Sequence, residues 1–306
     1  MKRIAPYIQL TIAALVIVSC TARAPQAEQP DRSIHSENAA ETNESSLANG
    51  GTAARGTQID QAVPLPDPAD PANELAGGSE TTERVVRPAD NAELQRKFPE
   101  TFFLHGPEKG NRIALTFDDG PDIRFTPQVL DILQKYDTKA TFFLLGSRAD
   151  GLPEITQRIH REGHAIGSHT YWHPKLVKEG VERMKWELAE TDKALKRTAG
   201  MKPRMFRPPY GALTEELMTE LVKMKYKVIG WNVDSLDWKQ IDSATIQDIV
   251  LSQLRPGSIV LMHSAGNWDQ DLSGMVQALD ALIPRLQQEG YTFVTVPELL
   301  GIREKR

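Results

Sequence analysis

Two histidines and two adjacent aspartates are the residues of this chain whose types and spacing best suit chemistry. His169 and His173 stand four positions apart in His-Thr-Tyr-Trp-His, and on one helical turn they would share a face and hold one metal ion. Asp118 and Asp119 follow an apolar run. Their side chains diverge, so one carboxylate can bind the metal while the other acts as a base. Two histidines and one carboxylate leave coordination positions open, as a catalytic metal requires.

Each half of this pattern also has a simpler interpretation. Histidines at this spacing are common on surface loops, and an Asp-Gly pair after a strand often forms only a turn. The run Ile113-Ala114-Leu115 indicates that the aspartates leave a buried strand, which is a poor setting for a purely solvated pair. The two acids and two histidines together therefore favour a metal site.

Further polar residues follow apolar runs later in the chain. His263 comes directly after the run 259–262. A lone histidine there is more often structural, but a carboxylate partner such as Asp237 would favour its protonated form and make it a candidate general acid. Arg207 precedes Pro208-Pro209-Tyr210-Gly211. Because prolines fix the backbone, this loop is either a rigid connector with an arginine ion pair or a means of aiming an N–H at a developing oxyanion.

Apolar runs alternate with amphipathic helical patterns about seven times in this part of the chain, which implies parallel strands in an open sheet or a barrel. Strands are predicted over 112–117, 140–145, 164–168, 205–206, 226–232, 258–262 and 292–296. Helices are predicted over 126–136, 153–162, 179–198, 213–224, 243–254 and 272–289, with Thr126 as the N-cap of the first and a last turn at 297–300. The candidate groups all follow predicted strands, where parallel β/α folds build their sites.

Composition separates a long N-terminal stretch from the rest of the chain. Residues 21–90 contain no Phe, Trp or Tyr, and they hold 12 acidic residues, 5 basic residues and 7 prolines. Such a segment buries too little apolar surface to offset its ordering entropy, so residues 20–90 are predicted to be a disordered acidic tether. Residues 91–306 remain for one catalytic domain, which we expect to be monomeric. This domain has no net charge, which argues against a nucleic-acid partner.

The N-terminus is typical of an exported protein. Lys2 and Arg3 precede an uncharged, largely apolar run over 4–19, which is short for a membrane span and typical of a secretory signal. An uncleaved anchor is the alternative. The run ends in Ile17-Val18-Ser19-Cys20, which resembles the bacterial lipobox.

The lipobox resemblance implies removal of residues 1–19 and a lipid on Cys20, the single cysteine of the chain. An ordinary signal peptide with an incidental cysteine is the other interpretation. We expect an extracytoplasmic lipoprotein held at a membrane, with a tether whose span is on the order of 45 Å.

Five motifs, in order over residues 112–264, resemble those of the NodB-homology polysaccharide deacetylases, carbohydrate esterase family 4. They read Thr-Phe-Asp-Asp-Gly at 116–120, Ser-His-Thr-Tyr-Trp-His-Pro at 168–174, Arg-Pro-Pro-Tyr-Gly at 207–211, Asp-Ser-Leu-Asp-Trp at 234–238 and Leu-Met-His at 261–263. The resemblance implies a distorted (β/α) barrel of about seven parallel strands. It also implies a bound divalent metal, zinc above all, with cobalt or nickel as alternatives.

The resemblance assigns the central chemical roles residue by residue. It implies that Asp119, His169 and His173 bind the metal. Asp118 would be the base that activates water at the metal, and His263 would be the acid that protonates the leaving amine.

Five more residues receive supporting roles from the same resemblance. Arg207 would orient Asp118 and balance its charge, and Asp237 would do the same for His263. Three residues would contact the reacting acetyl group: Tyr210 through its backbone N–H, and Trp238 and Leu261 as walls of the groove.

These expectations combine into a metal-dependent enzyme that removes N-acetyl groups from N-acetylglucosamine units of a polysaccharide. Peptidoglycan or a chitin-like glycan is the expected substrate, and attachment to a membrane favours peptidoglycan. An O-acetyl esterase acting on a xylan-type polysaccharide is one alternative. A non-catalytic glycan-binding lipoprotein is another, although none of the expected catalytic residues is missing. A serine hydrolase is excluded because no Gly-x-Ser-x-Gly elbow occurs.

Overall fold

A parallel β-sheet runs through the computed structural model, which describes residues 74–83 and 91–305. The predicted signal sequence, Cys20 and most of the predicted tether lie outside the described residues. Of the stretch 20–90, the structure describes only residues 74–83.

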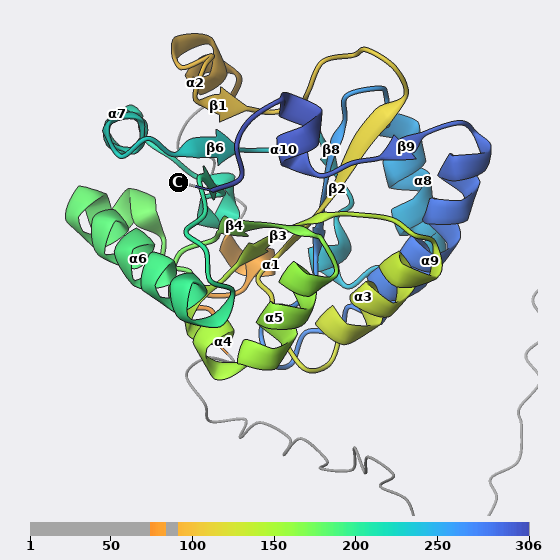
Figure 1. The fold of residues 1–306 in the computed structure, drawn as a ribbon, viewed down its shortest axis with the longest axis horizontal. Coiled ribbons are helices and arrows are strands. Elements are labelled where there is room, and N and C mark those ends of the chain that lie inside the picture. The colour runs from red at the N-terminus through yellow and green to blue at the C-terminus, as the bar shows by residue number, and fades with distance from the viewer. Residues whose placement is uncertain (1–73, 84–90, 306) are drawn as a thin grey trace, which may run out of the picture. The chain divides into compact units, whose positions relative to one another are not determined.

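The sheet is open and curled, and all of its strand pairs are parallel. In spatial order its strands are β1 (Phe102–Phe103), β6 (Lys227–Ile229), β5 (Met205–Phe206), β4 (Ala165–Ser168), β3 (Thr141–Leu144), β2 (Arg112–Asp118), β8 (Ile259–His263) and β7 (Val233–Asp234). A further short strand, β9 (Thr292–Phe293), pairs with the start of β2. The predicted distorted barrel of parallel strands is therefore confirmed, in the form of a half-barrel (Figure 1).

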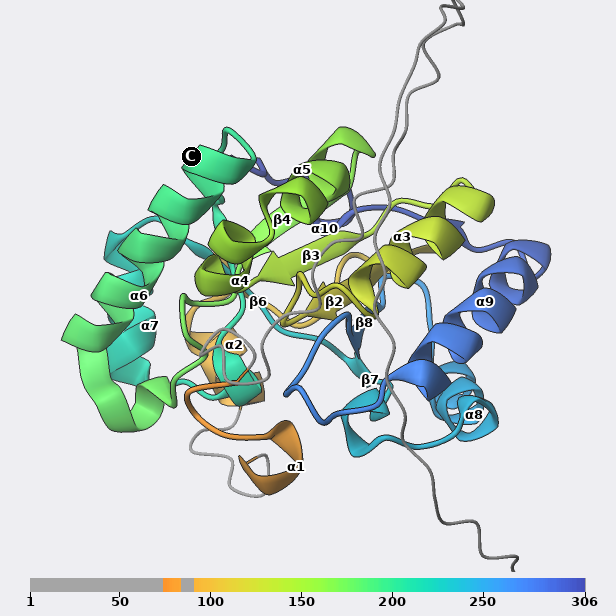
Figure 2. The same ribbon diagram turned by 90° about the horizontal axis from the view of Figure 1, so that it is seen from below.

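In the view of Figure 2, the longer helices surround the sheet on three sides, and the short helix α1 lies on the fourth. The longer ones are α3 (Thr126–Lys135), α5 (Pro153–Arg161), α6 (Leu176–Thr198), α7 (Glu215–Lys223), α8 (Ser243–Gln253) and α9 (Ser273–Gln288). Short helices and 3-10 turns complete the fold: α1 (Glu80–Glu83), α2 (Asn91–Lys97), α4 (Gly146–Gly151), α10 (Val296–Leu300), η2 (Pro209–Gly211) and η3 (Asp237–Lys239). In the described part of the chain, no helix combines the length and apolar character needed to cross a bilayer.

The central strands carry the core and also set the positions of the candidate site residues. Strand β8 is buried along its whole length, and β2 is buried after Arg112, as expected for strands covered on both faces. The two strands pair in a register that places Asp118 opposite His263. The apolar runs found in the sequence therefore deliver a carboxylate and an imidazole to the same end of adjacent strands.

The start of α3 differs from the sequence expectation. Thr126 is the first helical residue rather than the N-cap, and the N-cap Phe125 has no capping side chain. The cap comes from Asp122, whose Oδ1 accepts hydrogen bonds from the backbone N–H groups of Phe125 and Thr126 at 2.7 and 3.0 Å. The Thr126 hydroxyl instead donates to the Ser264 carbonyl at 3.0 Å, which ties α3 to the loop after β8.

Gly167 in β4 marks a place where the sheet has no room for a side chain. A Cβ there would overlap the ring of Phe143, which is fully buried and lies 4.2 Å from the Arg207 guanidinium carbon. We expect Gly167→Ala to lower the free energy of unfolding by about 1–3 kcal/mol, because overpacking forces side chains or backbone to shift. Urea unfolding measures this change. Gly151→Ala is the matched control, since a Cβ at Gly151 meets nothing within 4 Å; equal losses in both variants would contradict the packing argument.

Candidate active site

The predicted site residues gather at the carboxyl ends of the strands. Asp118 ends β2 and His263 ends β8, while Arg207 follows β5. The loop that starts at His169 follows β4, and Asp237 begins η3 after β7. Seven of the ten predicted residues in the described part are polar side chains with no more than 2% exposure: Asp118, Asp119, His169, His173, Arg207, Asp237 and His263.

Three side chains converge as a candidate metal site. Oδ1 of Asp119 lies 3.3 Å from Nε2 of His169 and 3.3 Å from Nε2 of His173. Within the described residues, both carboxylate oxygens of Asp119 and Nε2 of His173 are buried and make no hydrogen bond. Buried polar atoms without partners are costly. One oxygen and two nitrogen donors that face each other fit a divalent cation, which would satisfy them.

Hydrogen bonds on the far side of each ring orient the two histidines. Nδ1 of His169 donates to the Arg207 carbonyl at 2.8 Å, which leaves the Nε2 lone pair directed at Asp119. The Tyr210 hydroxyl donates to the Gly78 carbonyl at 2.8 Å, so Nδ1 of His173, 3.1 Å from the same hydroxyl, must be the donor of that pair. Burial lowers the pKa of His173 to about 3, which keeps this imidazole neutral and able to bind a metal.

The loop between the two histidines is not helical, so the expected shared helical face is wrong. Thr170 and His173 adopt left-handed conformations with φ of 74° and 61°, which cost energy unless the surroundings enforce them. Oε2 of Glu187 accepts hydrogen bonds from the backbone N–H groups of Tyr171 and Trp172 at 2.7 and 2.8 Å. The buried carboxylate of Glu187, from α6, therefore holds the loop in the shape that brings the two rings together.

Arg207 fixes the orientation of the candidate base. Its Nη1 donates to Oδ1 of Asp118 and to Oγ1 of Thr116, both at 2.8 Å. Its Nε and Nη2 donate to the carbonyls of Ile229 and Gly230 at the end of β6, both at 3.0 Å. The guanidinium is fully buried, and a buried ion pair is tolerated when the remaining donors find partners. One oxygen of Asp118 is thereby held, while Oδ2 lies 3.8 Å from Nε2 of His169.

Asp237 holds the candidate acid in the same way. Its Oδ1 lies 2.8 Å from Nδ1 of His263, and its Oδ2 accepts the backbone N–H of His263 at 2.7 Å. Burial opposes the charged imidazolium, but the surrounding carboxylates, Asp237 foremost with Asp119 and Glu80, together outweigh it and raise the pKa of His263 to about 10. Nε2 of His263 is buried without a hydrogen-bond partner among the described residues. It can therefore present a proton to a bound substrate.

The three residues expected beside the acetyl group differ in their surroundings. Tyr210 has φ of 61° within η2, which fixes the backbone of this turn in a left-handed conformation. Trp238 in η3 is 8% exposed, and its Nε1 donates to Oδ1 of Asp234 at 3.3 Å. Leu261 is fully buried in β8, with its Cα paired to that of Thr116.

Arg148 and Glu187 support the site but were missed by the sequence analysis. Arg148 of α4 is 5% exposed and donates to the Asp119 carbonyl at 2.9 Å, so it helps to hold the backbone at a position with φ of 68°. Glu187 is fully buried on the face of α6 that also buries Met184 and Thr191. In the sequence, Glu187 lies three residues after Met184 and four before Thr191, on the same helical face, and an acidic residue on a buried face was the available signal for Glu187.

Comparison with known proteins gives a consistent result. A family model described as polysaccharide deacetylase matches residues 105–229. A peptidoglycan-N-acetylglucosamine deacetylase from Bacillus cereus is 42% identical over 205 residues, which cover 67% of this chain and 74% of that protein. The chain belongs to the polysaccharide deacetylase family.

Other relatives extend this family assignment. The peptidoglycan-N-acetylmuramic acid deacetylase PdaC of Bacillus subtilis is 38% identical over 194 residues, which cover 63% of this chain and 40% of PdaC. The crystal structure of the Bc1960 peptidoglycan N-acetylglucosamine deacetylase, solved with a hydroxamate compound, superposes with a TM-score of 0.66 at 40% identity. That match covers 69% of this deacetylase and 98% of the solved chain. Polysaccharide deacetylases depend on a metal, in agreement with the candidate site Asp119, His169 and His173.

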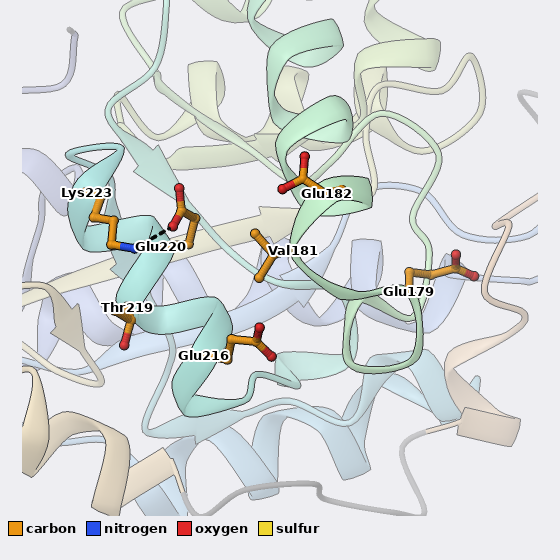
Figure 3. Close-up of a pocket in the computed structure, with 7 residues that line it drawn as sticks. All are labelled: Glu179, Val181, Glu182, Glu216, Thr219, Glu220 and Lys223. Carbon is orange, nitrogen blue, oxygen red and sulfur yellow. Dashed lines mark hydrogen bonds and ion pairs between the residues drawn. The ribbon is translucent and has the colours of Figure 1, made fainter.

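A cavity of about 600 Å³ lies away from these residues, between α6 and α7 (Figure 3). Its lining is mainly acidic, with Glu179, Glu182, Glu216 and Glu220. Lys223 pairs with Glu220 at 3.0 Å. The lining of this cavity contains none of the histidine–aspartate pairs found at the strand ends, so the chemistry of this deacetylase is assigned to the strand ends.

The Asp237–His263 pair predicts a pH dependence of stability. His263 keeps its proton up to a pH near 10 in the folded protein and up to about 6.5 when unfolded. This contribution to stability is fully present below about pH 6.5 and is lost as the pH rises through 10.

We expect the free energy of unfolding to fall less between about pH 7 and 10 in Asp237→Asn than in the parent. Urea unfolding across this range measures the difference. Asp248→Asn, at an exposed position, should follow the parent; an Asp237→Asn curve parallel to the parent's would argue against the pair.

Proposed function

We propose that this protein is a metal-dependent N-deacetylase of N-acetylglucosamine units in a polysaccharide, with peptidoglycan as the substrate. The observation that carries the proposal is that two ion pairs, one holding a base and one holding an acid, lie beside one group of candidate metal ligands. Asp118 with Arg207 and His263 with Asp237 stand on adjacent strand ends, beside Asp119 and the two histidines. Relatives at 38% and 42% identity are peptidoglycan deacetylases, which supports the choice of polymer.

The candidate metal ligands would provide a positively charged centre that activates the acetamide carbonyl. A divalent metal held by Asp119, His169 and His173 would polarise the acetamide carbonyl and would lower the pKa of the attacking water. One oxygen, two neutral nitrogens and open positions suit zinc, with cobalt or nickel as alternatives.

The remaining residues divide the proton transfers between them. Asp118 accepts a proton from the attacking water through Oδ2, because Arg207 occupies its other oxygen. The backbone N–H of Tyr210 donates to the carbonyl oxygen of the acetyl group, which becomes the oxyanion when water adds to the carbonyl carbon. His263 then gives the proton on Nε2 to the departing amine nitrogen, and the raised pKa set by Asp237 keeps that proton in place at neutral pH.

The protonation state of His263 bears on the type of bond cleaved. An amine leaves poorly unless it is protonated, whereas the alcohol of an ester leaves more readily. A buried imidazole whose protonated form is stabilised by Asp237 therefore favours N-deacetylation over O-acetyl ester hydrolysis. The complete set of base, acid and ligands favours an enzyme over a non-catalytic glycan-binding protein.

The placement of the enzyme in the cell forms part of the same proposal. Residues 1–19 would be a lipoprotein signal, and Cys20 would carry the lipid. Residues 20–90 would link the lipid to a monomeric catalytic domain over 91–306, and residues 75–83 of this tether lie ordered against that domain. This deacetylase would then work outside the cytoplasm, on the polymer that surrounds the membrane.

Acetate release tests the proposed activity. The purified full chain, with added zinc, is expected to release acetate from peptidoglycan and to lose this activity with a chelator. N-acetylated chitooligosaccharides and acetylated xylan serve as comparison substrates. Release from xylan alone would change the assignment to an esterase, and absence of release from every substrate in zinc-loaded protein would contradict the proposed enzyme.

Single substitutions test the division of roles. Asp118→Asn and His263→Ala are each expected to reduce kcat by about 10²- to 10⁴-fold, the usual contribution of a general base or acid, while zinc content stays near one ion per chain. His169→Ala should lose the zinc as well. Asp248→Asn is the control. Normal acetate release by either of the first two variants would refute the role assigned to that residue.

A further inference from the structure

Residues 75–80, here called the strap, lie on the loops that carry the candidate active site. The backbone N–H groups of Ala76 and Gly77 donate to the carbonyls of Trp172 and His173, both at 2.9 Å. The carbonyl of Gly78 accepts the Tyr210 hydroxyl at 2.8 Å. The strap is therefore hydrogen-bonded to the loop of a metal-ligand candidate and to the residue proposed to bind the oxyanion.

The strap also reaches the other side of the site. Leu75 is 3% exposed, and its backbone N–H donates to Oδ1 of Asn267, in the loop after β8. Helix α1, which begins with Glu80, packs against η3, the turn that contains Asp237 and Trp238. The strap and α1 together thus contact loops that follow β4, β5, β7 and β8, the strand ends that surround the reacting groups. Figure 2 shows α1 on the side of the sheet that the long helices leave open.

Glu80 brings a carboxylate into this site. Its side chain is 2% exposed, and Oε1 lies 3.8 Å from Nε2 of His173. Its charge also contributes to the raised pKa of His263. Glu80 is therefore close to a metal-ligand candidate and acts electrostatically on the proposed acid. An acetamide group under attack must lie between these same two histidines.

We propose that the strap is a built-in inhibitor of the active site, in which the Glu80 carboxylate takes the place of the substrate's acetyl group. This inference rests on the proposed deacetylase function. Hydrolysis of an acetamide yields acetate, so a carboxylate beside His173 resembles the product of the reaction. A glycan chain must displace the strap before its acetamide reaches Asp118 and His263.

A strap that covers the active site lowers the affinity of the site for its ligands. When a competent state is only partly populated, the apparent dissociation constant of a ligand rises by the inverse of that fraction. A strap that is closed about nine-tenths of the time would weaken every ligand of the site about tenfold. Variants that open the strap should recover this factor for small ligands and for glycans alike.

Two different substitutions open the strap by different means. Glu80→Gln removes the charge, and Glu74→Gln is its matched control, because Glu74 is an exposed acid at the end of the same segment. Gly77→Val adds a side chain whose Cβ would lie 2.8 Å from the His173 carbonyl and closer still to the Tyr210 hydroxyl. Gly151→Val is the control for it, since that position has open space around it.

The experiment uses the full chain loaded with zinc, with zinc content measured for each variant. Acetohydroxamate, a small metal-binding probe, is titrated into each protein, and acetate release from peptidoglycan is measured in parallel. We expect the Kd for acetohydroxamate to fall about tenfold in Glu80→Gln and in Gly77→Val, with kcat/KM for acetate release raised to a similar extent. Both controls should stay within about twofold of the parent.

The outcomes separate this inference from the proposed function. An unchanged Kd in both strap variants overturns the inhibitor, and so does an equal fall in Glu74→Gln. A loss of zinc together with weaker probe binding in Glu80→Gln also overturns it, because Glu80 would then support the site. If no variant releases acetate, the proposed deacetylase activity fails, while the acetohydroxamate titration still decides the role of the strap.

Discussion

The candidate active site depends on one buried cation. Arg207 is fully buried and donates four hydrogen bonds to two strands: to Thr116 and Asp118 of β2, and to the carbonyls of Ile229 and Gly230 at the end of β6. Its own carbonyl accepts the Nδ1–H of His169. A buried guanidinium is stable only where such partners surround it. Arg207 therefore fixes the carboxylate of the base and the tautomer of a metal-ligand candidate at the same time.

The site contains more buried polar atoms than its own hydrogen bonds satisfy. Asp118 and Asp237 each have a cationic or protonated partner, whereas the oxygens of Asp119 and the Nε2 atoms of His173 and His263 make no hydrogen bond within the described residues. The proposed reaction supplies a partner for each of these atoms. A metal would satisfy the ligand atoms, and the leaving amine would accept from His263. The fold tolerates this cost because the paired residues and the surrounding buried strands hold the rest of the site rigid.

The sequence predicted the sheet and the positions of the chemical residues, but not the loops that shape the site. The apolar runs at 112–117 and 258–262 identified β2 and β8 because strands buried on both faces leave a nearly continuous apolar signal. The motifs then placed Asp118 and His263 at the ends of these strands. The left-handed conformations of Thr170 and His173 left no local signal, because they depend on Glu187, which lies on a helix with many charged residues. The roles given to individual residues and the lipid on Cys20 stay predictions.

The strap escaped the sequence analysis for a related reason, and its composition explains why it can be displaced. A six-residue segment with one large apolar side chain and two glycines has no core of its own, so its ordering rests on partners that are distant in the sequence. Its hydrogen bonds to Trp172, His173, Asn267 and Tyr210 each contribute only about 0.5–1.5 kcal/mol net, and most of that is offset by the entropy of ordering the segment. Leu75 is the single large apolar side chain that the strap buries. A segment held this weakly can close a site in the absence of substrate and still yield to a polymer that makes many contacts along its length.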